Sequence, residues 1–365
     1  MFGEGRAARE RRFAQQSHVR LRRQDAGADS GAGLAHRARC GPGRPHVPHP
    51  FVAAVHVVII TFVPLQGARV PLQGPRQIYG QKAPARITMT STHSHRNFYA
   101  NFVVGSAGSS DAKLIAAFAS VERERFVGDG PWSIFVNPDY ISTGSSDPSL
   151  LYQDIVVGLA PERGINNGQP TLHARCLVTC APAPGDTVLH VGAGTGYYTA
   201  ILAALVGDSG NVVAYEIEND LASAARKNLQ HLPNVEVVAA SAMDGRLPNA
   251  DVIYVNAGAT HPPAIWLDAL NPGGRLIFPL TPNQGFGVML LVTHLAAGNY
   301  AANVVVPVAF IPCAGARDDA ASQALTTAIQ TRSIFAAKSL HRNIAADSTA
   351  CCVGDNWWLS TSAHA

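Results

Sequence analysis

A glycine-rich loop and an acidic residue are the strongest chemical signals in this sequence. The segment Gly192–Gly196 reads Gly-Ala-Gly-Thr-Gly and follows a short apolar run. Glycines at alternate positions let the backbone turn sharply and approach a ligand without a Cβ atom in the way. A helix that starts directly after the loop also turns its free N–H groups toward that ligand. Glu216 ends the next apolar run, where its carboxylate can accept hydrogen bonds from both ribose hydroxyls of an adenosine-containing ligand.

The spacing of the glycines discriminates between adenosine ligands. Nicotinamide dinucleotides are bound by the pattern GxGxxG, whereas Gly192–Gly196 gives GxGxG and lacks a glycine one position later. A pyrophosphate gains from a nearby helix N-terminus, but the sulfonium of S-adenosyl-L-methionine carries no phosphate and needs only a close approach of the backbone. The loop therefore favours S-adenosyl-L-methionine over a dinucleotide.

Short apolar runs that alternate with helical segments must position this loop. The predicted strands are Thr187–Val191, Val212–Ile217, Val235–Ala239, Asp251–Asn256, Arg275–Leu280, Val288–His294 and Val304–Phe310. The predicted helices between them are Tyr197–Val206, Asp220–Leu229 and Pro263–Leu270. The first four strands are almost continuously apolar, as parallel strands covered on both faces are. The pattern predicts an α/β fold with a doubly wound, Rossmann-like sheet of seven strands, the last two forming an antiparallel edge hairpin.

The first 88 residues differ sharply from the rest in charge. Residues 1–88 carry 14 Lys or Arg and four acidic residues, whereas residues 89–365 carry 14 Lys or Arg and 21 acidic residues. We interpret 1–88 as a basic, low-complexity extension, either a disordered arm that binds nucleic acid or acidic lipid or a segment that is not native. The change of pattern at Met89 favours translation starting there. The apolar run Phe51–Pro64 is too short for a membrane span and too far from the N-terminus for a signal peptide.

The remaining chain divides into three parts. Residues 89–150 are predicted to be a helical lead, with a helix over 98–127 and a loop over 128–150. Residues 151–317 form the predicted cofactor-binding domain, and 318–365 form a C-terminal extension in which Trp357 and Trp358 are expected to pack on the sheet edge. The acidic balance after residue 88 argues against a nucleic-acid partner. Six cysteines without a CxxC pair favour reduced thiols in a cytoplasmic protein over a metal site. We expect a monomer with no membrane partner.

Seven further segments carry a family resemblance. They are Val121–Val127 (VERERFV), Leu151–Asp154 (LYQD), Gly164–His173 (GINNGQPTLH), Ala224–Leu229 (AARKNL), Asn234–Val237 (NVEV), Asn271–Pro279 (NPGGRLIFP) and Val306–Pro312 (VPVAFIP). With the glycine loop, they resemble in type and order the protein-L-isoaspartate O-methyltransferase family of class I methyltransferases. The chain departs from that family in having His190 where a glutamate is usual and no serine at the end of the Gly164–His173 loop.

The resemblance implies which residues contact the cofactor. Gln169 stands in a loop that lines the site, and Ser241-Ala242 stand where the family has an aspartate-glycine pair facing the adenine. The predicted cofactor-binding residues are Gln169, Gly192, Ala193, Gly194, Thr195, Gly196, Glu216, Ser241 and Ala242. Asn256–Ala259, at the end of the fourth strand, is interpreted as a wall of the site, the alternative being a plain turn.

Two residues are candidates for the catalytic role. A carboxylate acceptor is ionised near neutral pH and needs no general base, but one of its oxygens must be held by a hydrogen-bond donor. Thr171 can donate from its hydroxyl and His173 from a ring nitrogen. The alternative for Thr171 is that it only caps a helix that begins near Leu172.

The resemblance implies a carboxyl O-methyltransferase that acts on L-isoaspartyl residues of damaged proteins or peptides and so starts their repair. Two alternatives remain from the residues alone. One is a methyltransferase for another peptide or small-molecule carboxylate, which the missing serine favours. The other is an S-adenosyl-L-methionine-binding protein without catalysis.

Overall fold

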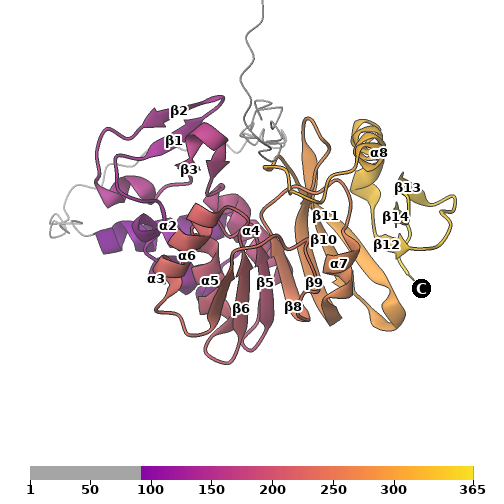
Figure 1. Ribbon diagram of the computed structural model, residues 1–365, viewed down its shortest axis with the longest axis horizontal. Helices are drawn as coiled ribbons and strands as arrows, with labels where there is room; N and C mark the ends of the chain where they lie inside the picture. Colours follow the sequence, from indigo (N-terminus) through magenta and orange to yellow (C-terminus); the bar gives the residue numbers. More distant parts are fainter. Residues whose placement is uncertain (1–91, 365) are drawn as a thin grey trace, which may run out of the picture. The chain divides into compact units, whose positions relative to one another are not determined.

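A ten-stranded mixed sheet organises residues 92–364, the part of the chain that the computed structural model describes (Figure 1). The predictions for residues 1–88 lie outside these residues. The strand order is β13-β14-β12-β11-β10-β9-β8-β5-β6-β7. In chain order, the first five strands of this sheet are β5 (Thr187–Val191), β6 (Asn211–Tyr215), β7 (Val235–Val238), β8 (Ala250–Val255) and β9 (Leu270–Leu280). They run parallel to one another, as the continuous apolar runs predicted.

The chain order reverses at β5, which pairs with β6 on one side and with β8 on the other. In an open α/β sheet, ligands bind beyond the carboxyl ends of the strands at such a reversal. The glycine loop follows β5 directly. The topology therefore places the loop where a ligand is expected.

The antiparallel half of the sheet is larger than the sequence suggested. Its strands are β10 (Gly287–His294), β11 (Tyr300–Val308), β12 (Ser339–Arg342), β13 (Ala350–Val353) and β14 (Trp357–Ser360). The predicted hairpin exists as β10 and β11, but β11 is not an edge, because β12 pairs with Tyr300 and Ala301. The sheet thus has ten strands rather than the predicted seven. The three extra strands have only four residues each, too few to establish an alternating pattern.

Helices cover both faces of the sheet, so the doubly wound class is confirmed. Successive residues of β8 point to opposite faces: Val252 and Tyr254 join one buried cluster, Ile253 and Val255 the other. The helices are α2 (Thr92–Ser106), α3 (Ala112–Ser120), α4 (Pro170–Cys180), α5 (Tyr197–Val206), α6 (Asn219–Leu229), α7 (Ala264–Asp268) and α8 (Asp319–Gln330). Helices α2 to α6 contribute to the first cluster, α7 and α8 to the second.

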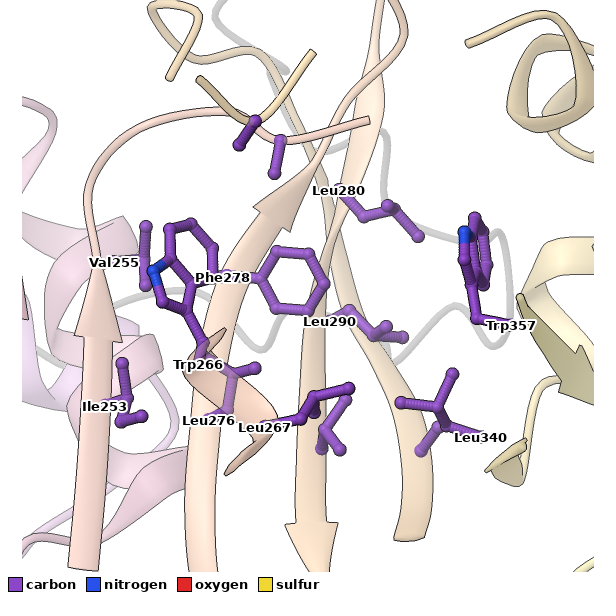
Figure 2. Packing of buried hydrophobic residues seen from close by; sticks show 14 of the residues in the cluster. Ile253, Val255, Trp266, Leu267, Leu276, Phe278, Leu280, Leu290, Leu340 and Trp357 are labelled. Atoms are coloured by element: carbon purple, nitrogen blue, oxygen red, sulfur yellow. The ribbon is translucent and has the colours of Figure 1, made fainter. Parts of the chain in front are cut away.

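The C-terminal extension shares the main core. Figure 2 shows Trp357 and Leu340 of the extension beside Leu290, in the cluster that also holds Phe278 and Trp266. Trp357 and Trp358 are 4% and 3% exposed, and both lie in β14, between β12 and β13, rather than on the sheet edge where we expected them. Their burial shows that the extension is stabilised by the same apolar packing as the sheet.

The N-terminal lead contains more structure than predicted. The expected helix over 98–127 is broken at Ala107–Ser110, where Gly108 adopts a positive φ of 85° and Asp111 caps the next helix. It ends in a short 3-10 turn, η1 (Arg123–Phe126). The predicted loop 128–150 contains a hairpin of β1 (Ser133–Val136) and β2 (Asp139–Ser142). Strand β1 also pairs with Val157 of the following segment, a contact that the local sequence pattern does not encode.

Candidate active site

The glycine loop has the backbone conformation that its sequence predicted. Gly192, Gly194 and Gly196 adopt φ values of 75°, 57° and 97°, a region that L-residues with a Cβ rarely occupy. A Cβ on Gly196 would also lie 2.6 Å from the Leu229 side chain. Helix α5 begins directly after Gly196, so its first N–H groups face the carboxyl end of β5.

Glu216 lies against this loop, as predicted. Its carboxylate is 5% exposed, and it accepts hydrogen bonds from the Gly194 N–H at 2.7 Å and the Glu218 N–H at 2.9 Å. Burial raises the pKa of Glu216, and these backbone N–H groups oppose the rise. Backbone N–H groups thus use only part of the hydrogen-bonding capacity of this carboxylate. We expect the remaining capacity to accept the two ribose hydroxyls of an adenosine ligand.

The other predicted cofactor residues contribute in different ways. The Thr195 hydroxyl donates to the Phe126 carbonyl of η1 and the Thr195 carbonyl accepts from Asn228 of α6, so both groups hold the loop against its neighbours. Ser241 and Ala242 follow β7 at the same edge of the sheet. The Ser241 hydroxyl accepts from the Met243 N–H at 3.0 Å, and Ala242 is buried.

A short hairpin, which we call the strap, covers the glycine loop. It comprises β3 (Gly158–Ala160), η3 (Pro161–Arg163) and β4 (Ile165–Asn166). The Leu159 side chain lies 3.2 Å from the Cβ position of Gly194. Arg163 forms ion pairs with Glu218 at 2.7 Å and with Asp220 at 2.6 Å. These ion pairs hold the strap to the segment that also orients Glu216. No local pattern in the sequence indicates this contact.

Replacing Arg163 with glutamine is expected to weaken S-adenosyl-L-methionine binding by about twofold to fivefold, because partly exposed ion pairs contribute up to about 1 kcal/mol. Titration calorimetry at about 0.1 M and about 1 M salt measures it, since the Debye length falls from about 10 to about 3 Å. The difference between wild type and variant should shrink at high salt. Arg226→Gln, which removes an exposed arginine of α6 that donates to the Val237 carbonyl, is the control. A loss of affinity that is equal at both salt concentrations would contradict the view that ion pairs of Arg163 hold the strap in place.

Helix α4 brings its first turn to the same edge of the sheet. Its last carbonyls, those of Cys180 and Ala181, accept hydrogen bonds from Arg275, which pairs with Val252 in the amino-terminal half of β8. An 11-residue helix spans about 16 Å, about the length of a five-residue strand. The first turn, which holds Thr171 and His173, therefore lies at the carboxyl ends of the strands.

Asp154 caps this helix from another segment. It accepts from the Thr171 N–H at 2.7 Å and from the Gln169 Nε2 at 2.8 Å, which favours a carboxylate at the positive end of the helix dipole. The helix begins at Pro170, and the Thr171 hydroxyl is buried with no hydrogen-bond partner among the described residues. The interpretation of Thr171 as the helix cap is therefore wrong.

His173 is 2% exposed and its ring is held on several sides. Its Nδ1 lies 2.8 Å from the Tyr254 hydroxyl, and its ring stacks on Tyr198 with centroids 3.7 Å apart. Phe310, just beyond β11, meets it edge-on. Burial lowers the pKa of His173 to about 3, with smaller contributions from His190 and Arg123. The imidazole is neutral at physiological pH.

His190 lies in β5 and connects this strand to Asn256, which follows β8. Asn256 donates from Nδ2 to His190 Nε2 at 2.8 Å, and Nδ1 donates to the Thr199 hydroxyl at 2.8 Å. Burial lowers the pKa of His190 to about 3. Asn256 also lies 3.5 Å from the Cβ position of Gly192, so the end of β8 borders the glycine loop. The departure from glutamate at this position thus gives a neutral pair that fixes Asn256.

Arg123 supports the site through the segment that caps α4, a role that the sequence pattern did not predict. It is fully buried and donates hydrogen bonds to the carbonyls of Leu151, Gln153 and Ile155 at 2.6, 3.0 and 2.6 Å. These carbonyls flank Asp154, so Arg123 fixes the segment that caps α4. The only signal was its place in the VERERFV segment.

Together these residues place the glycine loop and Glu216 beside the first turn of α4, which carries hydrogen-bond donors. Among residues 92–364, no group of three or more His, Cys, Asp or Glu side chains could hold a metal ion. No helix of the described chain has the length and hydropathy needed to cross a bilayer. The arrangement suits a transfer in which the protein aligns two reactants.

Comparisons with known proteins agree with this geometry. The family model described as Protein-L-isoaspartate(D-aspartate) O-methyltransferase matches residues 106–318. A Protein-L-isoaspartate O-methyltransferase of Aeropyrum pernix is 32% identical over 51% of this chain and 69% of its own. The Protein-L-isoaspartate O-methyltransferase of Ignicoccus hospitalis is 37% identical over 45% of this chain and 78% of its own. A solved protein-L-isoaspartate O-methyltransferase superposes with a TM-score of 0.51 and 25% identity, covering 68% of this chain and 72% of that chain. The chain therefore belongs to the protein-L-isoaspartate O-methyltransferase family of class I methyltransferases that use S-adenosyl-L-methionine.

Proposed function

We propose that this enzyme methylates the free α-carboxylate of L-isoaspartyl residues in damaged proteins and peptides. The observation that carries the proposal is the position of the first turn of α4, which offers hydrogen-bond donors at the same edge as the glycine loop and Glu216. The family match across residues 106–318 supports this acceptor. The methyl ester would activate the isoaspartyl residue for closure to a succinimide, the first step of repair.

The chemistry requires alignment and little else of the protein. Bound S-adenosyl-L-methionine supplies an electrophilic methyl group on a sulfonium. The acceptor carboxylate is ionised above pH about 4, so the site needs no general base. Glu216 and the glycine loop hold the adenosine end, while the first turn of α4 holds one carboxylate oxygen and directs the other along the displacement axis. Holding both partners in this geometry supplies most of the rate.

We assign the hydroxyl donor to Thr171. Its Oγ1 is buried and has no partner among the described residues, and an unpaired buried hydroxyl costs about 1–3 kcal/mol. An acceptor carboxylate would satisfy it. Asp154 fixes the backbone of Thr171 and the side chain of Gln169, so Gln169 is proposed to line the cofactor side of the same turn.

The function is tested with the full chain, radiolabelled S-adenosyl-L-methionine and a matched pair of peptides. One peptide contains an isoaspartyl residue and the other an aspartyl residue at the same position. Base-labile label on the isoaspartyl peptide alone is the expected result. Cofactor binding without label on either peptide would reject this acceptor and direct the search to other carboxylates.

Replacing Thr171 with valine is expected to lower kcat for the isoaspartyl peptide about tenfold, because one hydrogen bond to a charged group is worth about 1.5–3 kcal/mol. The dissociation constant of S-adenosyl-L-methionine should stay within about twofold of wild type. Thr179→Val is the matched control, since the Thr179 hydroxyl bonds only to the Arg175 carbonyl on the same helix. Equal kinetics for the two variants would remove Thr171 from the mechanism.

We also propose a cytoplasmic location. The five described cysteines are all unpaired, as in a reducing compartment. The predicted monomeric state and the predicted absence of nucleic-acid and membrane partners stay predictions.

A further inference from the structure

His173 occupies the space of a side chain that the chain lacks at position 168. A Cβ built on Gly168 would lie 2.2 Å from His173 Nε2 and 2.9 Å from its Cδ2. Gly168 also adopts a φ of 71°, which disfavours any residue with a Cβ. The imidazole thus reaches back from the first turn of α4 to the loop that precedes it. Its Nε2 lies where a short side chain at position 168 would begin.

The place of the ring relative to the site follows from its neighbours. Tyr198, on which the ring stacks, is the second residue of α5 and follows the glycine loop. Phe310, which meets the ring edge-on, follows β11 at the same end of the sheet. The Nε2 edge of the ring therefore lies at the boundary between the cofactor loop and the segment 166–169.

Tyr254 sets which nitrogen of the imidazole carries the proton. The Tyr254 hydroxyl is buried in β8 and lies 2.8 Å from His173 Nδ1. Burial raises the pKa of Tyr254 well above 10, so the hydroxyl keeps its proton. Its other neighbour is the Cys176 thiol, and thiol sulfur is a weak acceptor compared with an imidazole nitrogen. The hydroxyl therefore donates to Nδ1, and the proton of the neutral ring resides on Nε2.

We propose that His173, held as the Nε2–H tautomer by Tyr254, donates a second hydrogen bond to the acceptor carboxylate across Gly168. Tyr254 is then a positioning residue, and Gly168 must remain glycine. The inference rests on the proposed function for the identity of the acceptor, but the tautomer does not depend on it.

A neutral donor suits this acceptor better than a cation would. An imidazolium beside the carboxylate would stabilise its negative charge and reduce its nucleophilicity. Arg123, whose positive charge helps to lower the pKa of His173, is turned to three backbone carbonyls, and Asp154 is bound to Thr171 and Gln169. The ring thus holds the acceptor by a dipolar hydrogen bond only.

The tautomer is measured by imidazole ¹⁵N NMR on the full chain, with the His173 signals assigned from their loss in His173→Ala. The expected wild-type pattern is a protonated Nε2 and an unprotonated Nδ1. Tyr254→Phe should give a mixture of tautomers and lower kcat for the isoaspartyl peptide in proportion to the fraction of rings that lose the Nε2 proton, about twofold for an even mixture, with cofactor affinity within about twofold of wild type. A protonated Nδ1 in the wild type, or unchanged kcat after the tautomer shifts, would overturn the proposal.

A swap tests the space-filling relation. Gly168→Ser and His173→Ala should each lose activity, the first because the imidazole is displaced. Gly168→Ser should cost less activity in the His173→Ala background than in wild type, because the clash with the imidazole is then gone and only the strain of the positive φ remains. Equal costs in the two backgrounds would contradict the proposal. His294→Gln, a stacked histidine on β10, is the control. If wild type labels no isoaspartyl peptide, the proposed function fails, whereas the NMR result still reports on Tyr254 and His173.

Discussion

Replacing Arg123 with methionine is expected to reduce the free energy of unfolding by about 3–5 kcal/mol, the range for breaking buried, charge-assisted networks. Methionine preserves apolar volume but leaves the carbonyls of Leu151, Gln153 and Ile155 without their donor. Each unsatisfied buried carbonyl costs about 1–3 kcal/mol, less where water can enter. The guanidinium also lies over the rings of Tyr99 and Tyr197, 5.8 Å from each centroid, and these contacts are lost as well.

Urea denaturation followed by tryptophan fluorescence measures this loss. Arg125→Met is the matched control, because Arg125 lies two residues away in η1 and is exposed; its unfolding free energy should change by no more than about 0.5 kcal/mol. Variant Arg123→Met should also lose activity under conditions where it is folded, since segment 151–155 carries the aspartate that caps α4. Full stability in Arg123→Met would show that solvent replaces the guanidinium, and would remove its role in the site.

The protein is expected to lose stability steeply between pH 6.5 and pH 3. His173 and His190 have a pKa of about 3 in the folded state, against the ordinary value of 6.5 that applies to the unfolded chain. Below pH 6.5 the unfolded state therefore binds more protons than the folded state, and acid favours unfolding. The stabilisation is complete above pH 6.5 and falls by roughly 1 kcal/mol per histidine for each pH unit lost. Two such groups can remove about a third of a typical stability of 5–15 kcal/mol by pH 5.

Urea midpoints measured from pH 8 to pH 5 test this dependence. His190→Gln should be less stable than wild type at pH 8, because a buried hydrogen-bond chain from Asn256 to Thr199 is disturbed. Its stability should nevertheless fall less steeply with acid, since one titrating group is gone. His231→Gln, which removes an exposed histidine, should follow the wild-type slope. A slope for His190→Gln equal to that of wild type would mean that His190 titrates normally in the folded protein.

The sequence by itself determined the features that depend on local order. The positive φ values of Gly192, Gly194 and Gly196 follow from residues that accept them. The placement of Glu216 follows from the length of one strand-helix-strand unit. The parallel strands were predicted because a strand buried on both faces must be apolar throughout. These signals depend on neighbours within about 30 residues, so one sequence reveals them, and the family comparison confirmed the cofactor and the fold that they indicated.

Only the tertiary structure decided how the two halves of the site meet. Arg123 bonds to carbonyls about 30 residues away, Arg163 pairs with residues 55 and 57 positions later, and His173 meets Tyr254 across 81 positions. The three added strands were likewise hidden, because each is short and is stabilised mainly by its neighbours in the sheet. Contacts of this range arise from the packing of whole elements, and no periodicity in the chain encodes them. That is why the glycine loop could be located from the sequence, whereas the roles proposed for Thr171 and His173 rest on the three-dimensional arrangement.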